Sequence, residues 1–251
     1  GQVGVLEVLA GPPQPGMHPS VVEVAWRVRT HPGGTISGLY INPSVAGFFN
    51  KRWTFLMDAL AQSETAVTNV VLVSAGSGLS GARSAISRIL SSGLLLLPQL
   101  HLYYGLRDVL HLPYRQQLQA WAEKGMRFTL MLSSSTQSST LAIEQMAKQD
   151  DEVVARAIKR GAHLSALALE HKTPVTPFLN SSKKIYVQHA FGADLAFGPL
   201  RAAGASMINT AVVICGRAEL LREVPMILEA LCSERGRECT NFLAERVFTN
   251  I

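Results

Sequence analysis

The residues best suited to chemistry lie in a short glycine-containing turn. The apolar, β-branched segment 71–75 is typical of a buried strand, and it leads into Gly76-Ser77-Gly78 and then a helical pattern over 81–90. Glycines let a phosphate approach the backbone, and the start of a helix offers N–H groups and a positive dipole end. Gly-x-Gly also occurs as an ordinary tight turn. The strand–turn–helix order favours a nucleotide site, with Gly76, Ser77 and Gly78 binding phosphate.

A second candidate lies where the next predicted strand, over 101–104, ends. Ligands of open α/β sheets bind at the carboxyl ends of the strands. Arg107 follows this strand and could pair with a ribose phosphate, which would favour NADP over NAD; the alternative is a surface salt bridge with Asp108. Tyr114 could stack on an adenine, although a half-buried tyrosine at the start of a helix is equally ordinary.

The third candidate is the end of a predicted strand over 211–215. Cys215 and Gly216 follow four apolar residues there and precede another helical pattern. A cysteine at this position would lie at the mouth of the sheet, beside any nicotinamide, and we expect Cys215 to be the catalytic residue. The alternative is a small buried side chain, which is the more usual role of a single cysteine.

The elements that position these residues alternate regularly from residue 69 onward. Apolar runs predict strands over 69–74, 101–104, 126–132 and 211–215, and helical patterns fall over 81–90, 115–124 and 218–231. Continuous apolar strands separated by helices indicate a doubly wound parallel sheet with both faces covered. The sequence therefore predicts an α/β nucleotide-binding domain over about 65–251. Two further strands, over 3–9 and 21–28, flank a Pro- and Gly-rich turn.

A helical insertion over 134–182 interrupts this alternation. A serine-rich run leads into an amphipathic pattern over 140–172, which predicts two helices broken near Gly161. One interpretation is a packing helix over the sheet. The other is an arm that docks onto another subunit of a larger assembly.

Composition excludes several classes of protein. The 251 residues are 47% hydrophobic and 16% charged, with a scattered net charge of +5, so the chain is globular and has no nucleic-acid-binding arm. Three cysteines without a CxxC pair predict neither a disulfide framework nor a zinc site, and the seven histidines have no metal-binding spacing. No apolar run is long enough for a transmembrane segment.

Taken together, these stretches resemble the ferredoxin–NADP reductase superfamily, and most of all its chloroplast FAD/NAD(P)-binding oxidoreductase-like members in plants and green algae. The resemblance covers about 69–135 and 184–251. It rests on Ala75–Ser80, Tyr103–Arg107, Leu112–Trp121, Cys215-Gly216 and the tail Glu245–Ile251. It implies that Gly76–Gly78 receive the pyrophosphate, Arg107 and Tyr114 the adenosine end, and Cys215-Gly216 the nicotinamide.

The flavin half of that family matches less of this chain. The family holds FAD in a preceding antiparallel β-barrel, whereas residues 1–64 are short for one, so we expect a truncated barrel. Gly34-Thr35-Ile36-Ser37 matches the family's Gly-x-x-Ser, which assigns Gly34 and Ser37 to FAD, and the closing Ile251 would lie near the flavin. The family's Arg-x-Tyr-Ser stretch is missing, and Glu7 in its place would oppose a pyrophosphate by charge.

Three functions remain open at this point. The resemblance implies an FAD-linked NAD(P)H oxidoreductase in the chloroplast stroma. The missing flavin motif favours instead a non-catalytic, reductase-like subunit of a larger organellar complex, because fold does not guarantee function. A third alternative is a protein that binds NADP or NAD for sensing or stability and has lost its flavin.

Overall fold

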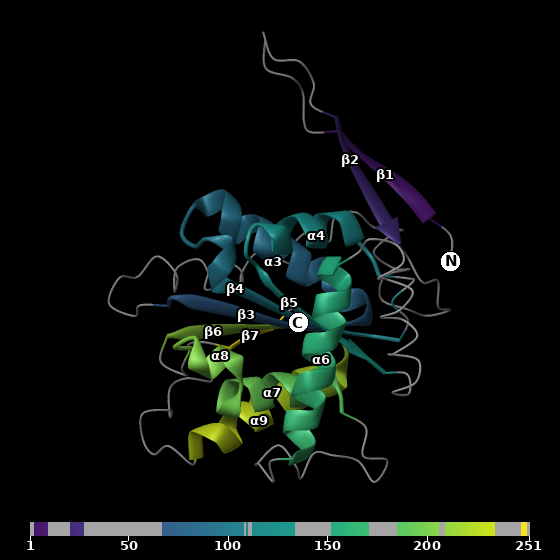
Figure 1. Cartoon of the computed structure of the whole chain (residues 1–251). Coiled ribbons are helices and arrows are strands. Elements are labelled where there is room, and N and C mark those ends of the chain that lie inside the picture. The colour runs from purple at the N-terminus through teal and green to yellow at the C-terminus, as the bar shows by residue number, and fades with distance from the viewer. Residues whose placement is uncertain are drawn as a thin grey trace. The chain divides into compact units, whose positions relative to one another are not determined.

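The computed structural model describes residues 3–9, 21–27, 67–107, 109, 112–133, 152–170, 185–205, 209–233 and 247–249. The chain divides into two compact units, Gly1–Phe49 and Asn50–Ile251. Figure 1 shows the elements of both units.

The first unit contains a two-stranded antiparallel sheet. Strands β1 (Val3–Leu9) and β2 (Val21–Arg27) pair in a register that sets Val3 opposite Arg27 and Leu9 opposite Val21. Both predicted N-terminal strands are therefore confirmed. The truncated β-barrel stays a prediction, because two paired strands fit a barrel and a simple hairpin equally well.

The second unit is built on a five-stranded parallel sheet, as the alternation of apolar runs and helical patterns predicts. Its strands are β3 (Asn69–Ala75), β4 (Leu100–Leu106), β5 (Arg127–Leu132), β6 (Thr210–Cys215) and β7 (Val247–Thr249). They lie in the order β5-β4-β3-β6-β7, and every neighbouring pair is parallel. The three central strands are almost completely buried, which explains their continuous apolar runs.

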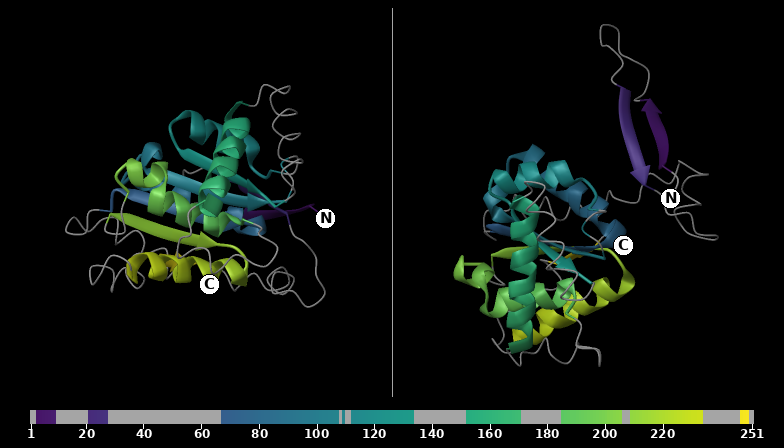
Figure 2. Two further views of the ribbon diagram at one scale, coloured as in Figure 1. Left: turned by 60° about the horizontal axis from the view of Figure 1, so that its bottom comes forward. Right: turned by 45° about the vertical axis from the view of Figure 1, so that its right-hand side comes forward.

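Helices cover both faces of this sheet (Figures 1 and 2). Helices α3 (Leu79–Ser92) and α4 (Arg115–Glu123) lie on one face, and α7 (Val187–Phe197) and α9 (Ala218–Ser233) lie on the other. The core on the first face includes Leu72, Ile86 and Leu102, and the core on the second includes Phe191 and Val212. The described part of the unit also has short turns of helix: η2 (Gly76–Gly78), η3 (Leu97–Gln99) and α8 (Pro199–Ala202). Among the helices of the described ranges, none combines the length and apolar character needed to cross a membrane.

In the described part of the helical insertion, α6 (Glu152–Glu170) runs without interruption through Gly161, so the predicted break near Gly161 is wrong. Gly161 lies against the edge strand β5, where an added Cβ would lie 1.9 Å from the Leu130 carbonyl oxygen. The glycine therefore permits close packing and does not end the helix. Helix α6 crosses β5, so it covers a sheet edge that would otherwise offer unpaired backbone groups (Figure 2). The described part of the insertion is thus a packing helix.

Helix α7 has no counterpart among the sequence predictions. All its residues except the last are buried, so it lacks the polar face that gives an amphipathic pattern. The start of α7 packs on the sheet, where Val187 lies against Gly105 near the carboxyl end of β4.

Candidate functional site

The strand order reverses between β3 and β6, and we call the region beyond the carboxyl ends of these two strands the crevice. From β3 the chain proceeds to β4 and β5 on one side of the sheet, and later returns to β6 and β7 on the other side. Ligands of open α/β sheets bind where the strand order reverses in this way. Gly76-Ser77-Gly78 follows β3, and Cys215-Gly216 lies at the end of β6. The fold therefore brings together two stretches that are far apart in the sequence.

Gly78 joins the two sides of this crevice by direct backbone packing. A Cβ at Gly78 would lie 2.1 Å from the Cys215 carbonyl oxygen and 2.7 Å from the Cα of Gly216. No side chain fits in that space, so only glycine lets the start of α3 approach the end of β6 so closely. Close helix–strand packing is one of the purposes that glycines serve in dinucleotide-binding turns.

Gly76 and Ser77 form the open part of the turn. Gly76 has a φ of +56°, and no atom lies within 4 Å of where its Cβ would be. Both residues are exposed. The Tyr104 hydroxyl donates a hydrogen bond of 3.0 Å to the Gly76 carbonyl, and Ser80 Oγ donates one of 3.0 Å to the Ser77 carbonyl. These two hydrogen bonds therefore hold the turn in place, while Gly76 and Ser77 stay exposed to solvent.

Tyr104 is a site residue that the sequence pattern does not reveal. It reads as one more apolar strand residue, and its hydrogen-bond partner is 28 positions away in the chain. Burial raises the pKa of Tyr104 to about 12, and the nearby Tyr114 phenol adds to the shift. The phenol therefore stays protonated at neutral pH and keeps its role as donor.

Cys215 presents its backbone, and not its thiol, to the crevice. The side chain is 0% exposed and faces α3, where a Cβ at Gly81 would lie 3.2 Å from the sulfur. Burial raises the pKa of the Cys215 thiol to about 12. Cys215 is therefore a small buried side chain with a neutral thiol packed under a helix. This position argues against Cys215 as a reacting group.

The predicted adenosine-side residues lie beyond β4. Arg107 follows β4 directly and is exposed. Tyr114 precedes α4 in a left-handed backbone conformation with a φ of 54°, and it is 37% exposed. The Arg83 guanidinium lies 4.6 Å from the centre of the Tyr114 ring, a cation–π contact, while Arg83 Nε donates a hydrogen bond to Gln117 Oε1. One face of Tyr114 is therefore already occupied, by an arginine that the sequence pattern did not single out.

Three predicted site residues lie outside the described residues: Gly34, Ser37 and Ile251. The structure therefore places Gly76, Ser77, Gly78 and Gly216 at one crevice, with Arg107 and Tyr114 beyond the neighbouring strand. The flavin-binding assignments stay predictions.

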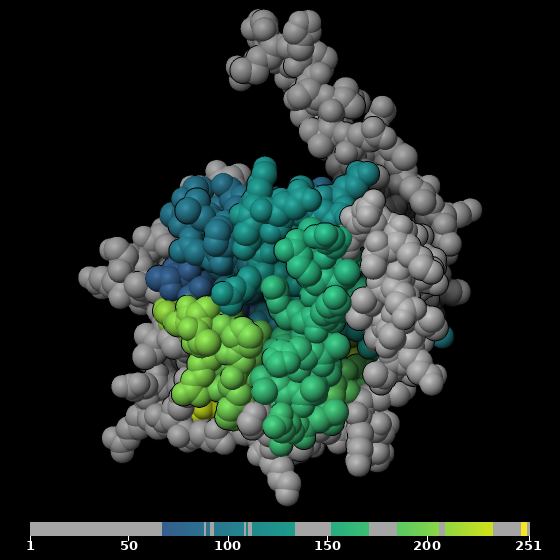
Figure 3. Space-filling view, in the orientation of Figure 1, coloured from purple at the N-terminus to yellow at the C-terminus, as the bar shows by residue number. Residues whose placement is uncertain are grey.

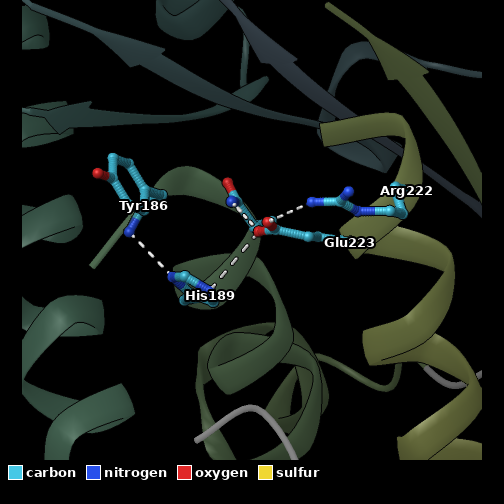
Figure 4. A network of polar contacts seen from close by, with 5 residues as sticks. Tyr186, His189, Arg222 and Glu223 are labelled. Carbon is cyan, nitrogen blue, oxygen red and sulfur yellow. Dashed lines mark hydrogen bonds and ion pairs between the residues drawn. The ribbon is translucent and has the colours of Figure 1, made fainter. Parts of the chain in front are cut away.

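A polar network ties α7 to α9 beside this sheet (Figure 4). His189 is fully buried, and its Nδ1 accepts a hydrogen bond of 3.1 Å from the Tyr186 backbone N–H. Glu223 on α9 accepts a hydrogen bond of 2.6 Å from Gln188 and lies 3.7 Å from the Arg222 guanidinium. His189 Nε2 lies 4.0 Å from the same carboxylate. These contacts fix the first turn of α7 and do not form an open site.

No known protein-family model matches the chain, and no curated protein matches its sequence. In the described part of the chain, no three His, Cys, Asp or Glu side chains are grouped as metal ligands would be. The arguments for function therefore come from the fold and the geometry of the crevice.

Proposed function

We propose that the second unit binds a pyridine dinucleotide across the crevice between the ends of β3 and β6. The observation that carries this proposal is the packing of Gly78 on the Cys215–Gly216 peptide at the point where the strand order reverses. The pyrophosphate would lie over Gly76, Ser77 and Gly78, and the nicotinamide beside Gly216.

Electrostatics at the start of α3 support an anionic ligand. The first turn of α3 contains no acidic residue, so the positive end of its dipole is not neutralised there. Arg83 lies one turn into the same helix, and Arg107 lies beyond β4. An arginine that pairs with the ribose phosphate favours NADP over NAD, and we therefore propose NADP as the preferred ligand.

An FAD-linked NAD(P)H oxidoreductase of the ferredoxin–NADP reductase type is one form of this function. The bound cofactors would carry the electrons, and the protein would orient them. The resemblance of Ala75–Ser80, Tyr103–Arg107 and Cys215-Gly216 to that superfamily supports this form. It also requires bound FAD, for which the sequence predicts contacts from Gly34, Ser37 and Ile251.

A non-catalytic, nucleotide-binding subunit of a larger organellar assembly is the second candidate. The specific observation in its favour is the buried Cys215 thiol, because the reductase form predicts this cysteine at the nicotinamide. The insertion over 134–182 would supply the contact with a partner. A chloroplast location follows in both forms from the resemblance.

The test is a titration of the full chain with NADPH and with NADH, in which the fluorescence of the nucleotide reports binding. We expect saturable binding, tighter for NADPH, and weaker NADPH binding in Arg107→Gln. An absorption spectrum of the native protein then separates the two forms: a flavin spectrum that bleaches with NADPH supports the oxidoreductase. A colourless protein that binds NADPH supports the non-catalytic subunit. Absence of binding to both nucleotides would overturn the proposal.

A further inference from the structure

A second site lies in the amino-terminal half of β4 and β5, away from the crevice. A cavity of about 310 Å³ opens there between the sheet and helices α6, α7 and α8. Figure 3 shows α6 and the α7–α8 segment side by side on one face of the molecule, beside the segment 67–133. This volume is at the lower end of the range of small-molecule sites, which is roughly 300–1,000 Å³.

Charged side chains converge on this cavity from three elements. Arg127 comes from the start of β5, Arg160 from α6, and Asp194 from α7. Arg127 Nη1 donates to the Pro199 carbonyl at 3.4 Å, and Arg160 Nη1 donates to the Phe128 carbonyl at 3.1 Å. These bonds orient each guanidinium through one nitrogen, and a guanidinium has five N–H donors.

Asp194 is already satisfied by the protein. Its Oδ2 accepts a hydrogen bond of 2.6 Å from the Tyr103 hydroxyl, and its Oδ1 accepts one of 2.6 Å from the Leu200 N–H. Both oxygens therefore have donors within the protein. With two guanidinium groups and one carboxylate, the charged side chains of the cavity sum to one positive charge.

His101 supplies an unsatisfied polar group at the same place. It is 3% exposed and lines the cavity, and neither ring nitrogen has a hydrogen-bond partner among the described residues. Burial, together with Arg127 and Arg160, lowers its pKa to about 4, so the ring is neutral at neutral pH. A neutral imidazole carries one N–H donor, and leaving it unsatisfied in a buried site is costly.

We propose that this cavity binds a small organic monocarboxylate, held by Arg127, Arg160 and the N–H of His101. The ligand would balance the single excess positive charge and accept the histidine's N–H. A planar carboxylate also matches the forked donors of a guanidinium. A phosphate dianion would instead leave one excess negative charge in a partly buried site.

This carboxylate site does not depend on the proposed nucleotide site. His101 and Arg127 lie at the amino ends of β4 and β5, whereas the glycine turn follows the carboxyl end of β3. A chain that fails to bind NADPH would still bind the carboxylate.

The experiment follows the His101 ring by NMR in the full chain, labelled with ¹³C at histidine. The spectrum of His101→Gln identifies its resonance. Sodium propionate is added at constant ionic strength, with sodium chloride and inorganic phosphate as parallel titrations. We expect a saturable shift with propionate, and a rise of about one unit in the pKa of His101 when propionate is bound, because an adjacent anion favours the charged ring.

Arginine variants test whether propionate binds in this cavity. Arg160→Gln should weaken propionate binding by about tenfold or more, and Arg160→Lys by less, because a charged hydrogen bond is lost or only altered. Arg156→Gln is the matched control, since Arg156 is an exposed residue one turn earlier on α6, and it should bind as the unaltered chain does. The proposal is overturned if propionate and chloride act alike, if phosphate binds more tightly, or if Arg156→Gln weakens binding as much as Arg160→Gln.

Discussion

The backbone of Gly161 lies directly against the carbonyl oxygen of Leu130, so that a methyl group at this position would stand 1.9 Å from that oxygen. The contact joins the middle of helix α6 to the edge strand of the sheet. The helix can cover β5, and bring Arg160 to the carboxylate cavity, only because residue 161 has no side chain.

Gly161→Ala therefore separates helix propensity from packing. In an exposed helix, replacing glycine by alanine stabilises by about 1 kcal/mol. Here we expect a loss of about 3 kcal/mol in the free energy of unfolding, measured in urea. The added methyl group would collide with the backbone of β5, and moving that strand would disrupt the packing of the sheet. Ala166→Gly, at an exposed position of the same helix, should cost about 1 kcal/mol. A stabilised Gly161→Ala protein would show that α6 is not packed on β5 in this way.

Gly78→Ala should abolish NADPH binding. Its Cβ would meet the Cys215 carbonyl at 2.1 Å, so the glycine turn and the end of β6 must move apart. Gly93→Ala is the control at the other end of α3. Its φ is +69°, whereas the φ of Gly78 is −62°, and no atom lies within 4 Å of the added Cβ at Gly93. It should cost about 1 kcal/mol of stability and leave NADPH binding unchanged. Equal NADPH affinity in both variants would contradict the role given to Gly78.

The free energy of unfolding should decrease as the pH falls through a window set by His101. Its pKa is about 4 in the folded protein and 6.5 in the unfolded chain, so below pH 6.5 the unfolded state binds the proton first. The folded state should lose about 3 kcal/mol between pH 6.5 and pH 4, with little further loss from this group at lower pH. Urea unfolding in buffers without carboxylates measures the effect.

His101→Gln isolates that contribution from the other charges at the cavity. Arg127, Arg160, Asp194 and Tyr103 face the same space and remain in the variant. Burial raises the pKa of Asp194, which gives stability the opposite dependence on pH. The difference between the two proteins' unfolding curves should therefore show the His101 window, and parallel curves would refute it.

Tyr103→Phe should destabilise the second unit by about 2 kcal/mol. The substitution removes the 2.6 Å donor to Asp194 and leaves a buried carboxylate oxygen without that hydrogen bond. The edge-on packing of the ring on Phe191, with centroids 5.5 Å apart, should persist. The control is Tyr104→Phe, which removes a partly buried bond to the Gly76 carbonyl and should cost about 1 kcal/mol. Thermal unfolding compares the two, and an equal loss would argue against a special role for the Asp194 pair.

The sequence alone determined four strands of the described parallel sheet, β3 to β6, and several helices, because those signals are local. Continuous apolar runs revealed the three central strands, and helical spacing revealed α3, α4 and α9. The glycine turn after β3 was also visible, since glycines between a strand and a helix have a local meaning. Helix α7 was not visible, because a helix buried almost all round has no amphipathic pattern.

Only the tertiary structure decided what particular residues do. Gly161 looked like a helix break and serves as a packing surface, since helix α6 approaches β5 at that point. Cys215 looked like a reactive group, and its thiol lies under α3 because the alternation of the strand directs it there. His101, Arg160 and Asp194 come together from three elements over 94 positions (101 to 194). No local pattern links them, because their proximity is created by the order of the strands and the path of α6.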